Sequence, residues 1–336
     1  MLGQTGLGYS FDDFTNSKAD ELGDCIKRFF PVLVQNTAML LVCSELEPWF
    51  SHSTIRALFC LVPHKGIRYF MYISDTMTKR AREIIVRANI AAADNEKLTH
   101  EELVAQISTF MLAGMDTTSN ALARVFQLLA EHPEAQAKLR AEVAEAQGND
   151  RADLSYEVLE RLPYLDAVCR ETLLFAPVPA SSRTTYDSAT KDTVLPFMEP
   201  IRLRDGTEVS ELFVERGTTV TPLFFATNID RALWGPDANE WKPERWLRAI
   251  PKPVEDARIP GVYAHLTTFS AGTHSCIGFK SSQLEMKVII SLLITRYQFD
   301  VTRKPVAWNF APVIHPTMGE ESERPELLLN VTATED

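Results

Sequence analysis

A long stretch of helical periodicity in the middle of the chain constrains the fold most. Thr99 and Glu102 have the spacing of a capping box, in which each residue's side chain bonds the other's backbone at a helix start. Apolar residues then recur every three or four positions, and the pattern stops before Pro133. At 1.5 Å per residue this predicts one helix of about 32 residues, roughly 48 Å long. Such a helix crosses a whole domain, so the other elements must pack around it.

The middle of this helix has a poor helix-forming sequence. Residues 113–118 read Ala-Gly-Met-Asp-Thr-Thr. Glycine costs about 1 kcal/mol relative to alanine in a helix interior, and threonine hydroxyls compete for backbone carbonyls. A weak stretch inside a strong helix indicates a local opening or kink that has a use. The alternative is a tolerated imperfection in which Asp116 is merely solvated.

A single cysteine in a glycine-bearing loop is the second informative feature. The loop reads Phe-Ser-Ala-Gly-Thr-His-Ser-Cys-Ile-Gly over residues 269–278 and runs into another helical pattern. Cys276 is therefore expected at or just before a helix N-terminus, where backbone N–H groups and the helix dipole favour a thiolate. Three interpretations stay open: a buried cysteine acting as a small hydrophobe, a nucleophile with His274 as its base, or a thiolate ligand to heme iron.

Composition narrows the class of protein. The chain has 336 residues, 45% of them hydrophobic, and can bury a large core in one big domain or two ordinary ones. Its net charge of −11, without a lysine and arginine cluster, argues against a nucleic-acid partner. The five cysteines lie far apart in sequence, which indicates a reducing compartment rather than a disulfide framework. No uninterrupted apolar run reaches the length of about 18 residues that a membrane span needs.

The loop around Cys276 resembles the heme-binding loop of cytochrome P450 monooxygenases. The positions that carry the resemblance are Phe269, Gly272, His274, Cys276 and Gly278. The resemblance implies heme b, with Cys276 as the axial thiolate ligand to the iron. The family usually has arginine where this chain has His274, and the resemblance implies that this basic group holds a heme propionate, more weakly as histidine.

The Ala-Gly-x-Asp-Thr-Thr stretch is similar to the oxygen-activation motif of the same family, and the two motifs occur in the family's order. The resemblance implies that Ala113 belongs to the heme-binding surface, that Asp116 relays protons and that Thr117 holds the water network next to oxygen. Arg183 stands where the family often places a basic residue that binds a propionate; an exposed arginine on a strand is the alternative.

One departure from the family pattern concerns a charge network. The family pairs a glutamate with an arginine three residues later, whereas Glu171 is followed at that position by Leu174. Arg170 points about 100° away on a helix and cannot simply replace that arginine. A Pro-Glu-Arg-Trp element further on supplies Arg245, which is expected to pair with Glu171. A buried network reduced from three members to two is expected to leave hydrogen-bonding capacity unmet and to weaken heme incorporation.

The expected fold is mainly α within the α+β class. It is a cytochrome P450 fold lacking its N-terminal part, with a long central helix and small mixed sheets. Residues 1–97 are expected to be a helical remnant of the N-terminal half, and residues 98–336 the heme-binding catalytic core. A hairpin is predicted at Asp205-Gly206, and residues 218–225 are predicted as a strand.

The resemblance implies an oxidoreductase, a heme-thiolate monooxygenase of fungal type that inserts one atom of dioxygen into a small organic substrate. Its electrons would come from a separate NADPH-dependent P450 reductase, since no dinucleotide fingerprint occurs in the chain. The alternative is a truncated, catalytically inactive remnant of the family with impaired heme binding. A cysteine hydrolase built on Cys276 and His274 fits only one of the motifs. For the family, the resemblance implies the cytoplasmic face of the endoplasmic reticulum membrane; without a recognisable anchor, this chain is also compatible with the cytoplasm.

Overall fold

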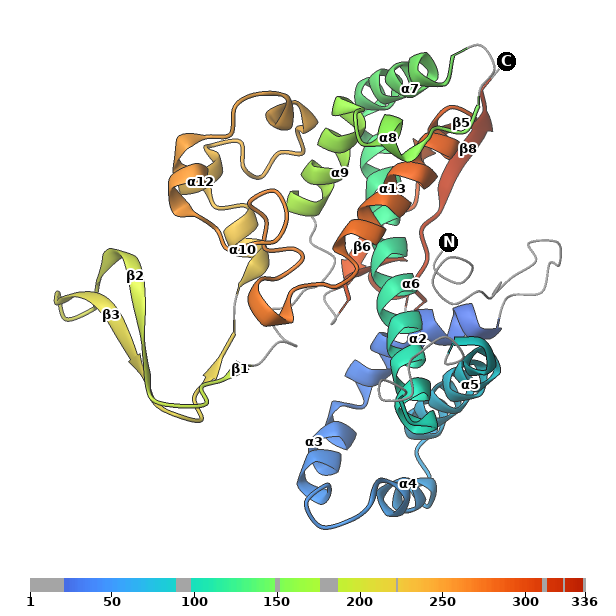
Figure 1. Ribbon diagram of the computed structural model, residues 1–336, viewed down its shortest axis with the longest axis vertical. Helices are drawn as coiled ribbons and strands as arrows, with labels where there is room; N and C mark the ends of the chain where they lie inside the picture. Colours follow the sequence, from blue (N-terminus) through green and yellow to red (C-terminus); the bar gives the residue numbers. More distant parts are fainter. Residues whose placement is uncertain are drawn as a thin grey trace.

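Helices dominate the computed structural model, which describes residues 21–88, 98–148, 152–175, 187–221, 223–309, 313–322 and 324–334 (Figure 1). The helices are α2 (Glu21–Gln35), α3 (Thr37–Leu46), α4 (His52–Cys60), α5 (Lys65–Ala88), α6 (His100–Glu131), α7 (Pro133–Gln147), α8 (Tyr156–Leu159), α9 (Pro163–Phe175), α10 (Phe224–Asn228), α11 (Arg231–Trp234), α12 (Lys252–Ala257) and α13 (Phe279–Ile294). The described residues also include the 3-10 helices η1 (Pro243–Leu247) and η2 (Gly272–His274). The prediction of a mainly α fold with small sheets is confirmed.

The described strands form four antiparallel pairs. The pairs are β1 (Asp187–Ser188) with β4 (Thr219–Val220), β2 (Thr193–Arg202) with β3 (Glu208–Val214), β5 (Tyr297–Val301) with β8 (Leu329–Ala333), and β6 (Val306–Asn309) with β7 (His315–Met318). The predicted hairpin is present between β2 and β3. Gly206 has a φ of 88°, and the Asp205 side chain accepts a hydrogen bond from the Thr207 N–H at 2.9 Å. The strand predicted over residues 218–225 is wrong in its second half, because α10 begins at Phe224; a short apolar run does not distinguish a strand from a helix by periodicity.

Helix α6 is the long helix that the sequence predicts. It has 32 residues and begins with the capping box: Thr99 Oγ1 accepts from the Glu102 N–H, and Glu102 Oε2 accepts from the Thr99 N–H at 2.8 Å. The predicted opening at residues 113–118 is not observed, since these residues are α-helical throughout. The Thr117 hydroxyl donates to the Ala113 carbonyl at 2.7 Å, so its competition for that carbonyl is absorbed within the helix.

Two clusters of buried apolar side chains lie along α6. One surrounds its C-terminal half, where α7, α9 and α13 pack against it (Figure 1). Fully buried members of this cluster include Val125, Leu139, Leu165 and Ile290. The other cluster joins the N-terminal half of α6 to α2 and α5 and includes Ile26, Ile73 and Met111. Burying each such side chain stabilises the fold by about 1.5–3 kcal/mol. Helix α6 contributes residues to both clusters and therefore joins them.

The described helices were also compared with the length and hydrophobicity of a membrane-spanning helix. In the described parts of the chain, no single helix has the length and apolar character of a membrane span. Helix α2 and residues 37–43 meet the length and composition criteria only when they are taken together, and they are bent by 73°.

Candidate functional site

The loop that carries Cys276 leads directly into α13, as predicted. Gly278 is the N-cap of α13, so Cys276 lies just before the helix N-terminus. The Cys276 N–H donates to the Phe269 carbonyl at 2.9 Å, which closes the loop on itself. Gly272 has a φ of 66°, a left-handed conformation that favours glycine, and no atom lies within 4 Å of where a Cβ would be. The backbone is thus compact, and the thiol stands on an open surface.

The exposure of Cys276 decides between two of its interpretations. Cys276 is exposed and free, whereas Cys25 and Cys169 are buried. The interpretation as a buried small hydrophobe is therefore wrong for Cys276. His274 is also exposed, in η2, and within the described residues no hydrogen bond joins it to Cys276. The pairing that a cysteine hydrolase needs is consequently not formed in this structure.

Phe269 connects the loop to the interior. Its ring lies edge-on to Tyr263, with centroids 5.8 Å apart, and 6.3 Å from the ring of Phe279. The Arg170 guanidinium in turn lies 5.4 Å from the centroid of the Tyr263 ring. Arg170 also forms an ion pair with Asp166 at 2.6 Å, so it faces away from Glu171, as helix geometry predicts. These contacts attach the loop to α9.

The predicted oxygen-activation residues lie on two faces of α6. Ala113 is exposed and Thr117 half-buried, four residues apart on one face. Asp116 is 6% exposed, so the interpretation as a solvated carboxylate is wrong. Burial raises the pKa of Asp116 to about 7, against the opposing effects of the Asn120 hydrogen bond and the Lys27 charge. Asp116 can therefore hold or release a proton near neutral pH.

Asn120 is a site residue that the sequence interpretation missed. Its Nδ2 donates to the Asp116 carbonyl at 2.9 Å and to Asp116 Oδ1 at 3.2 Å, and both side chains are buried. The available signal was the spacing, because residues four apart meet on a helix face.

Glu171 and Arg245 form the buried ion pair that the sequence predicts. Arg245 Nε lies 3.1 Å and 3.0 Å from the two carboxylate oxygens of Glu171. The Lys242 N–H donates to Glu171 Oε1 at 2.7 Å, and the Trp246 indole N–H donates to Oε2 at 2.8 Å. Burial raises the pKa of Glu171, and Arg245 is the largest opposing influence.

The expectation of unmet hydrogen bonding in this network is wrong. Both carboxylate oxygens of Glu171 accept two hydrogen bonds, and Arg245 Nη2 also donates to the carbonyls of Asp237 at 2.8 Å and Glu240 at 3.1 Å. The missing donors come from the η1 segment, whose backbone and indole groups replace the absent arginine. Leu174 itself is fully buried in the apolar cluster around α6.

An arginine at position 174 is expected to destabilise the chain. Leu174→Arg removes a buried apolar side chain and forces a longer charged one into a filled space, for a loss of about 2–4 kcal/mol. Chemical denaturation of the heme-free chain measures this, with Leu174→Met as the control that conserves volume and is expected to lose less than about 1.5 kcal/mol. A Leu174→Arg chain as stable as the unaltered one would contradict this expectation and show that the site accommodates an arginine.

Helix α13 is held at its middle by a buried lysine. Lys287 is 1% exposed, and its Nζ lies 3.0 Å from Asp166 Oδ1 and 3.1 Å from Glu160 Oε1. Burial alone would lower the pKa of Lys287, but Asp166 and Glu160 outweigh it and raise the pKa above its ordinary value. Lys287 therefore stays charged and connects α13 to α8 and α9.

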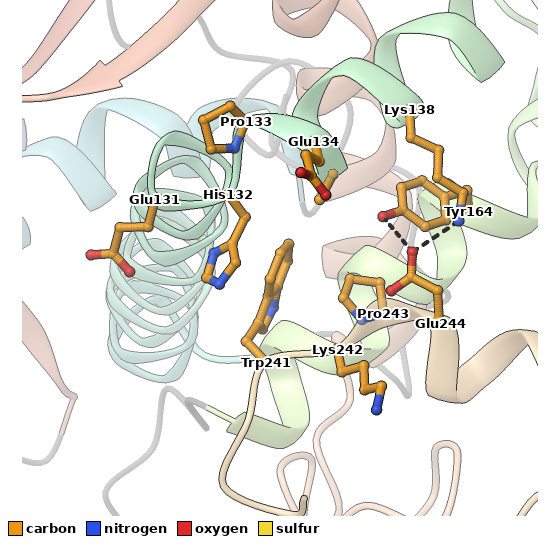
Figure 2. A pocket seen from close by; sticks show the side chains of 11 residues that line it. Glu131, His132, Pro133, Glu134, Lys138, Tyr164, Trp241, Lys242, Pro243 and Glu244 are labelled. Carbon is orange, nitrogen blue, oxygen red and sulfur yellow. Dashed lines mark hydrogen bonds and ion pairs between the residues drawn. The ribbon is translucent and has the colours of Figure 1, made fainter.

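A pocket of about 460 Å³ lies elsewhere, at the junction of α6 and α7 with η1. Figure 2 shows His132 beside Trp241 and the Tyr164 hydroxyl directed at Glu244. Lys138 forms an ion pair with Glu244 at 2.8 Å and lies 4.0 Å from the centroid of the Tyr164 ring. Lys138 and Glu244 thus neutralise each other within this pocket, whereas Lys242 pairs with Asp237 outside its lining. None of the predicted site residues lines it.

The residues present fit a heme group in chemical terms. Cys276 offers an exposed free thiol, a soft ligand that suits iron. Ala113 on α6 is likewise exposed, and in the described parts of the chain no hydrogen bond or ion pair ties it to the cysteine loop. Arg183 lies outside the described residues.

Comparison with known proteins identifies one family. Residues 7–310 match the family model described as cytochrome P450. Over 99% of its length the chain is 45% identical to ganoderic acid synthetase CYP5150L8 of Ganoderma lucidum, and over 98% it is 40% identical to cytochrome P450 monooxygenase 91 of Postia placenta. A crystal structure of a cytochrome P450 (CYP102L1) is similar with a TM-score of 0.67 at 20% identity and covers 99% of the chain. The chain spans 66%, 65% and 66% of the lengths of these three proteins, just under two thirds.

Proposed function

The chain belongs to the cytochrome P450 family, and from this premise we propose that it binds heme b through Cys276 and acts as a monooxygenase on a small organic substrate. The observation that carries the proposal is the exposed, free thiol of Cys276 in a glycine-bearing loop before α13. Of the five cysteines, Cys276 is the one whose loop turns at a glycine with positive φ, Gly272.

Each predicted residue has a role toward the cofactor. When bound, heme supplies the dioxygen chemistry, and a thiolate ligand favours cleavage of the O–O bond. Cys276 would hold the iron, and Ala113 would border the heme from α6. His274 would bind a heme propionate from η2. The sequence resemblance gives Arg183 the same role. Phe269 would support the cysteine loop from within through its contacts with Tyr263 and Phe279.

Asp116 and Thr117 would manage protons. With a pKa of about 7, Asp116 is protonated in a substantial fraction of molecules at neutral pH and can give its Oδ proton away. Thr117 directs its hydroxyl proton to the Ala113 carbonyl, and its oxygen can accept a hydrogen bond from a water on the exposed face. The pair thus combines a proton source on the buried face with an oxygen that orders water on the open face.

Replacing Asp116 with asparagine is expected to raise the folding stability at alkaline pH and to lower the turnover rate. The carboxylate is harder to ionise in the fold than in the unfolded chain, where its pKa is about 4, so folding stability falls as pH rises from about 4 to 7. Asp116→Asn removes this cost and is expected to stabilise the chain at pH 8 by on the order of 1–3 kcal/mol, with little effect at pH 4. Turnover is expected to fall about 100-fold. Denaturation at both pH values and turnover measurements check the two effects, and equal stability shifts at pH 4 and 8 would reject the buried carboxylate as their cause.

A partner must supply the electrons. We propose an NADPH-dependent P450 reductase, because the chain lacks the strand-glycine-helix fingerprint of a dinucleotide site. Uncoupled turnover tests this without a known substrate. With reductase and heme, the chain should make NADPH consumption and peroxide formation rise, and Cys276→Ser should return both to background. Consumption that does not depend on the chain would instead support the alternative, a catalytically inactive family member.

A further inference from the structure

The segment that enters the cysteine loop is fixed by a buried asparagine far away in sequence. Asn228, the last residue of α10, is 1% exposed, and Thr267 and Thr268 beside it are buried as well. Thr268 is 40 residues from Asn228 along the chain. These two threonines directly precede Phe269, the residue whose carbonyl receives the Cys276 N–H.

The hydrogen bonds of Asn228 use both ends of its side-chain amide. Its Nδ2 donates to Thr268 Oγ1 at 2.8 Å, and its Oδ1 accepts from the Thr267 N–H at 3.0 Å. The Thr267 hydroxyl lies within hydrogen-bond distance of Asn228 Oδ1, at 3.0 Å, and of the Phe224 carbonyl, at 3.1 Å. The Thr268 hydroxyl also donates to the Leu173 carbonyl at 2.7 Å, near the end of α9, and so links Asn228 to that helix.

The backbone around these threonines needs such support. Ala264, His265 and Ser270 have φ values of 52°, 59° and 58°, a left-handed conformation that is unfavourable for residues other than glycine. Gly261 lies so close to Leu266 that a Cβ on it would come within 1.8 Å of the Leu266 carbonyl oxygen. A strained segment keeps one conformation only where contacts with its surroundings hold it there. The hydrogen bonds of Asn228 provide such contacts.

We propose that Asn228 and Thr268 are positioning residues that set the place of the Cys276 thiol relative to the heme iron. The connection runs from Asn228 through Thr268 to Phe269, and from the Phe269 carbonyl to the Cys276 N–H. The inference rests on the proposed function, because it assigns a role toward the thiolate ligand. Neither residue touches the thiol, so both act through the backbone of the loop.

Thr268 offers a matched pair of substitutions. Thr268→Val keeps the shape of the side chain but removes the acceptor for Asn228 and the donor to Leu173, whereas Thr268→Ser keeps both. Thr227→Val serves as the control, because the exposed Thr227 hydroxyl on the same helix α10 bonds the Leu223 carbonyl one turn away and no other described residue. If Thr268→Val does not fold, Thr267→Val replaces it, since that substitution keeps the backbone N–H bond to Asn228.

Two measurements test the proposal. In the heme-free chain, hydrogen exchange of the Cys276 and Ser270 amides is expected to rise about tenfold in Thr268→Val and to be unchanged in Thr268→Ser and Thr227→Val. In the heme-loaded, reduced chain with carbon monoxide, Thr268→Val is expected to shift part of the Soret absorption from the thiolate-type band to the band of heme without a thiolate ligand. Thr268→Ser, which keeps both hydrogen bonds, is expected to retain the thiolate-type band of the unaltered chain.

The outcomes separate this proposal from the proposed function. Unchanged exchange and an unchanged Soret band in Thr268→Val would overturn the positioning role. Exchange that rises equally over α7 and β5 would overturn it too, because it would show general destabilisation. If the unaltered chain binds no heme, the proposed function fails, and the exchange measurement alone then decides whether Asn228 and Thr268 order the loop.

Discussion

Replacing Cys276 with serine is expected to abolish the thiolate-type absorption spectrum of the heme-loaded chain while the fold stays intact. The thiol is exposed and free, and the hydrogen bond that ties this residue to Phe269 comes from its backbone N–H, which serine keeps. A serine hydroxyl is a poor ligand to heme iron at neutral pH, so the loss of the thiolate-type band should be complete. The free energy of unfolding of the heme-free chain should change by no more than about 0.5 kcal/mol, as for other exposed positions.

Cys60 supplies the control for this experiment. It is the other exposed cysteine among those described, and it lies at the end of α4 rather than in the loop. Cys60→Ser is expected to leave the reduced, carbon monoxide-bound spectrum unchanged. A thiolate-type band that survives in Cys276→Ser would reject the ligand assignment, and its loss in Cys60→Ser would point to Cys60 as the ligand instead.

Replacing Glu171 with alanine is expected to destabilise the chain by about 3–5 kcal/mol, even without heme. Glu171 is fully buried and accepts hydrogen bonds from Arg245, the Lys242 N–H and the Trp246 indole. The substitution leaves the Arg245 guanidinium, whose side chain is 7% exposed, without its main counter-charge. Chemical denaturation of the heme-free chain measures the loss.

The matched control for Glu171 is an ion pair at the surface. Asp75 pairs with Arg56 at 2.6 Å, but both side chains are exposed. Asp75→Asn is expected to cost less than about 1 kcal/mol, because water and salt screen an exposed pair. If the two substitutions cost the same, burial would not be what makes the Glu171 network important for stability.

Local signals made much of the fold predictable. The capping box at Thr99 and the stop before Pro133 gave the bounds of α6 to within a residue, since both features act on the helix itself. The turn at Gly206 and the placement of Cys276 just before α13 were predictable for the same reason. In each case the residues that determine the structure are neighbours in the sequence.

Contacts between distant segments were not predictable in the same way. The completeness of the Glu171 network depends on donors from η1, which lies about seventy residues further along the chain. The burial of Asp116 depends on tertiary packing around α6, and helical spacing alone left it compatible with solvent. Asn228 gave no sequence signal, because its partners Thr267 and Thr268 are ordinary residues whose importance comes from their position before Phe269.

The most direct test of heme ligation by Cys276 is the absorption spectrum of the unaltered chain, supplied with heme, reduced and exposed to carbon monoxide. We expect a red-shifted, thiolate-type Soret band at one heme per chain, because Cys276 presents a free thiol and the supporting Glu171 network is complete. The absence of any Soret band in folded, soluble chain, or a band typical of heme without a thiolate ligand, would contradict it.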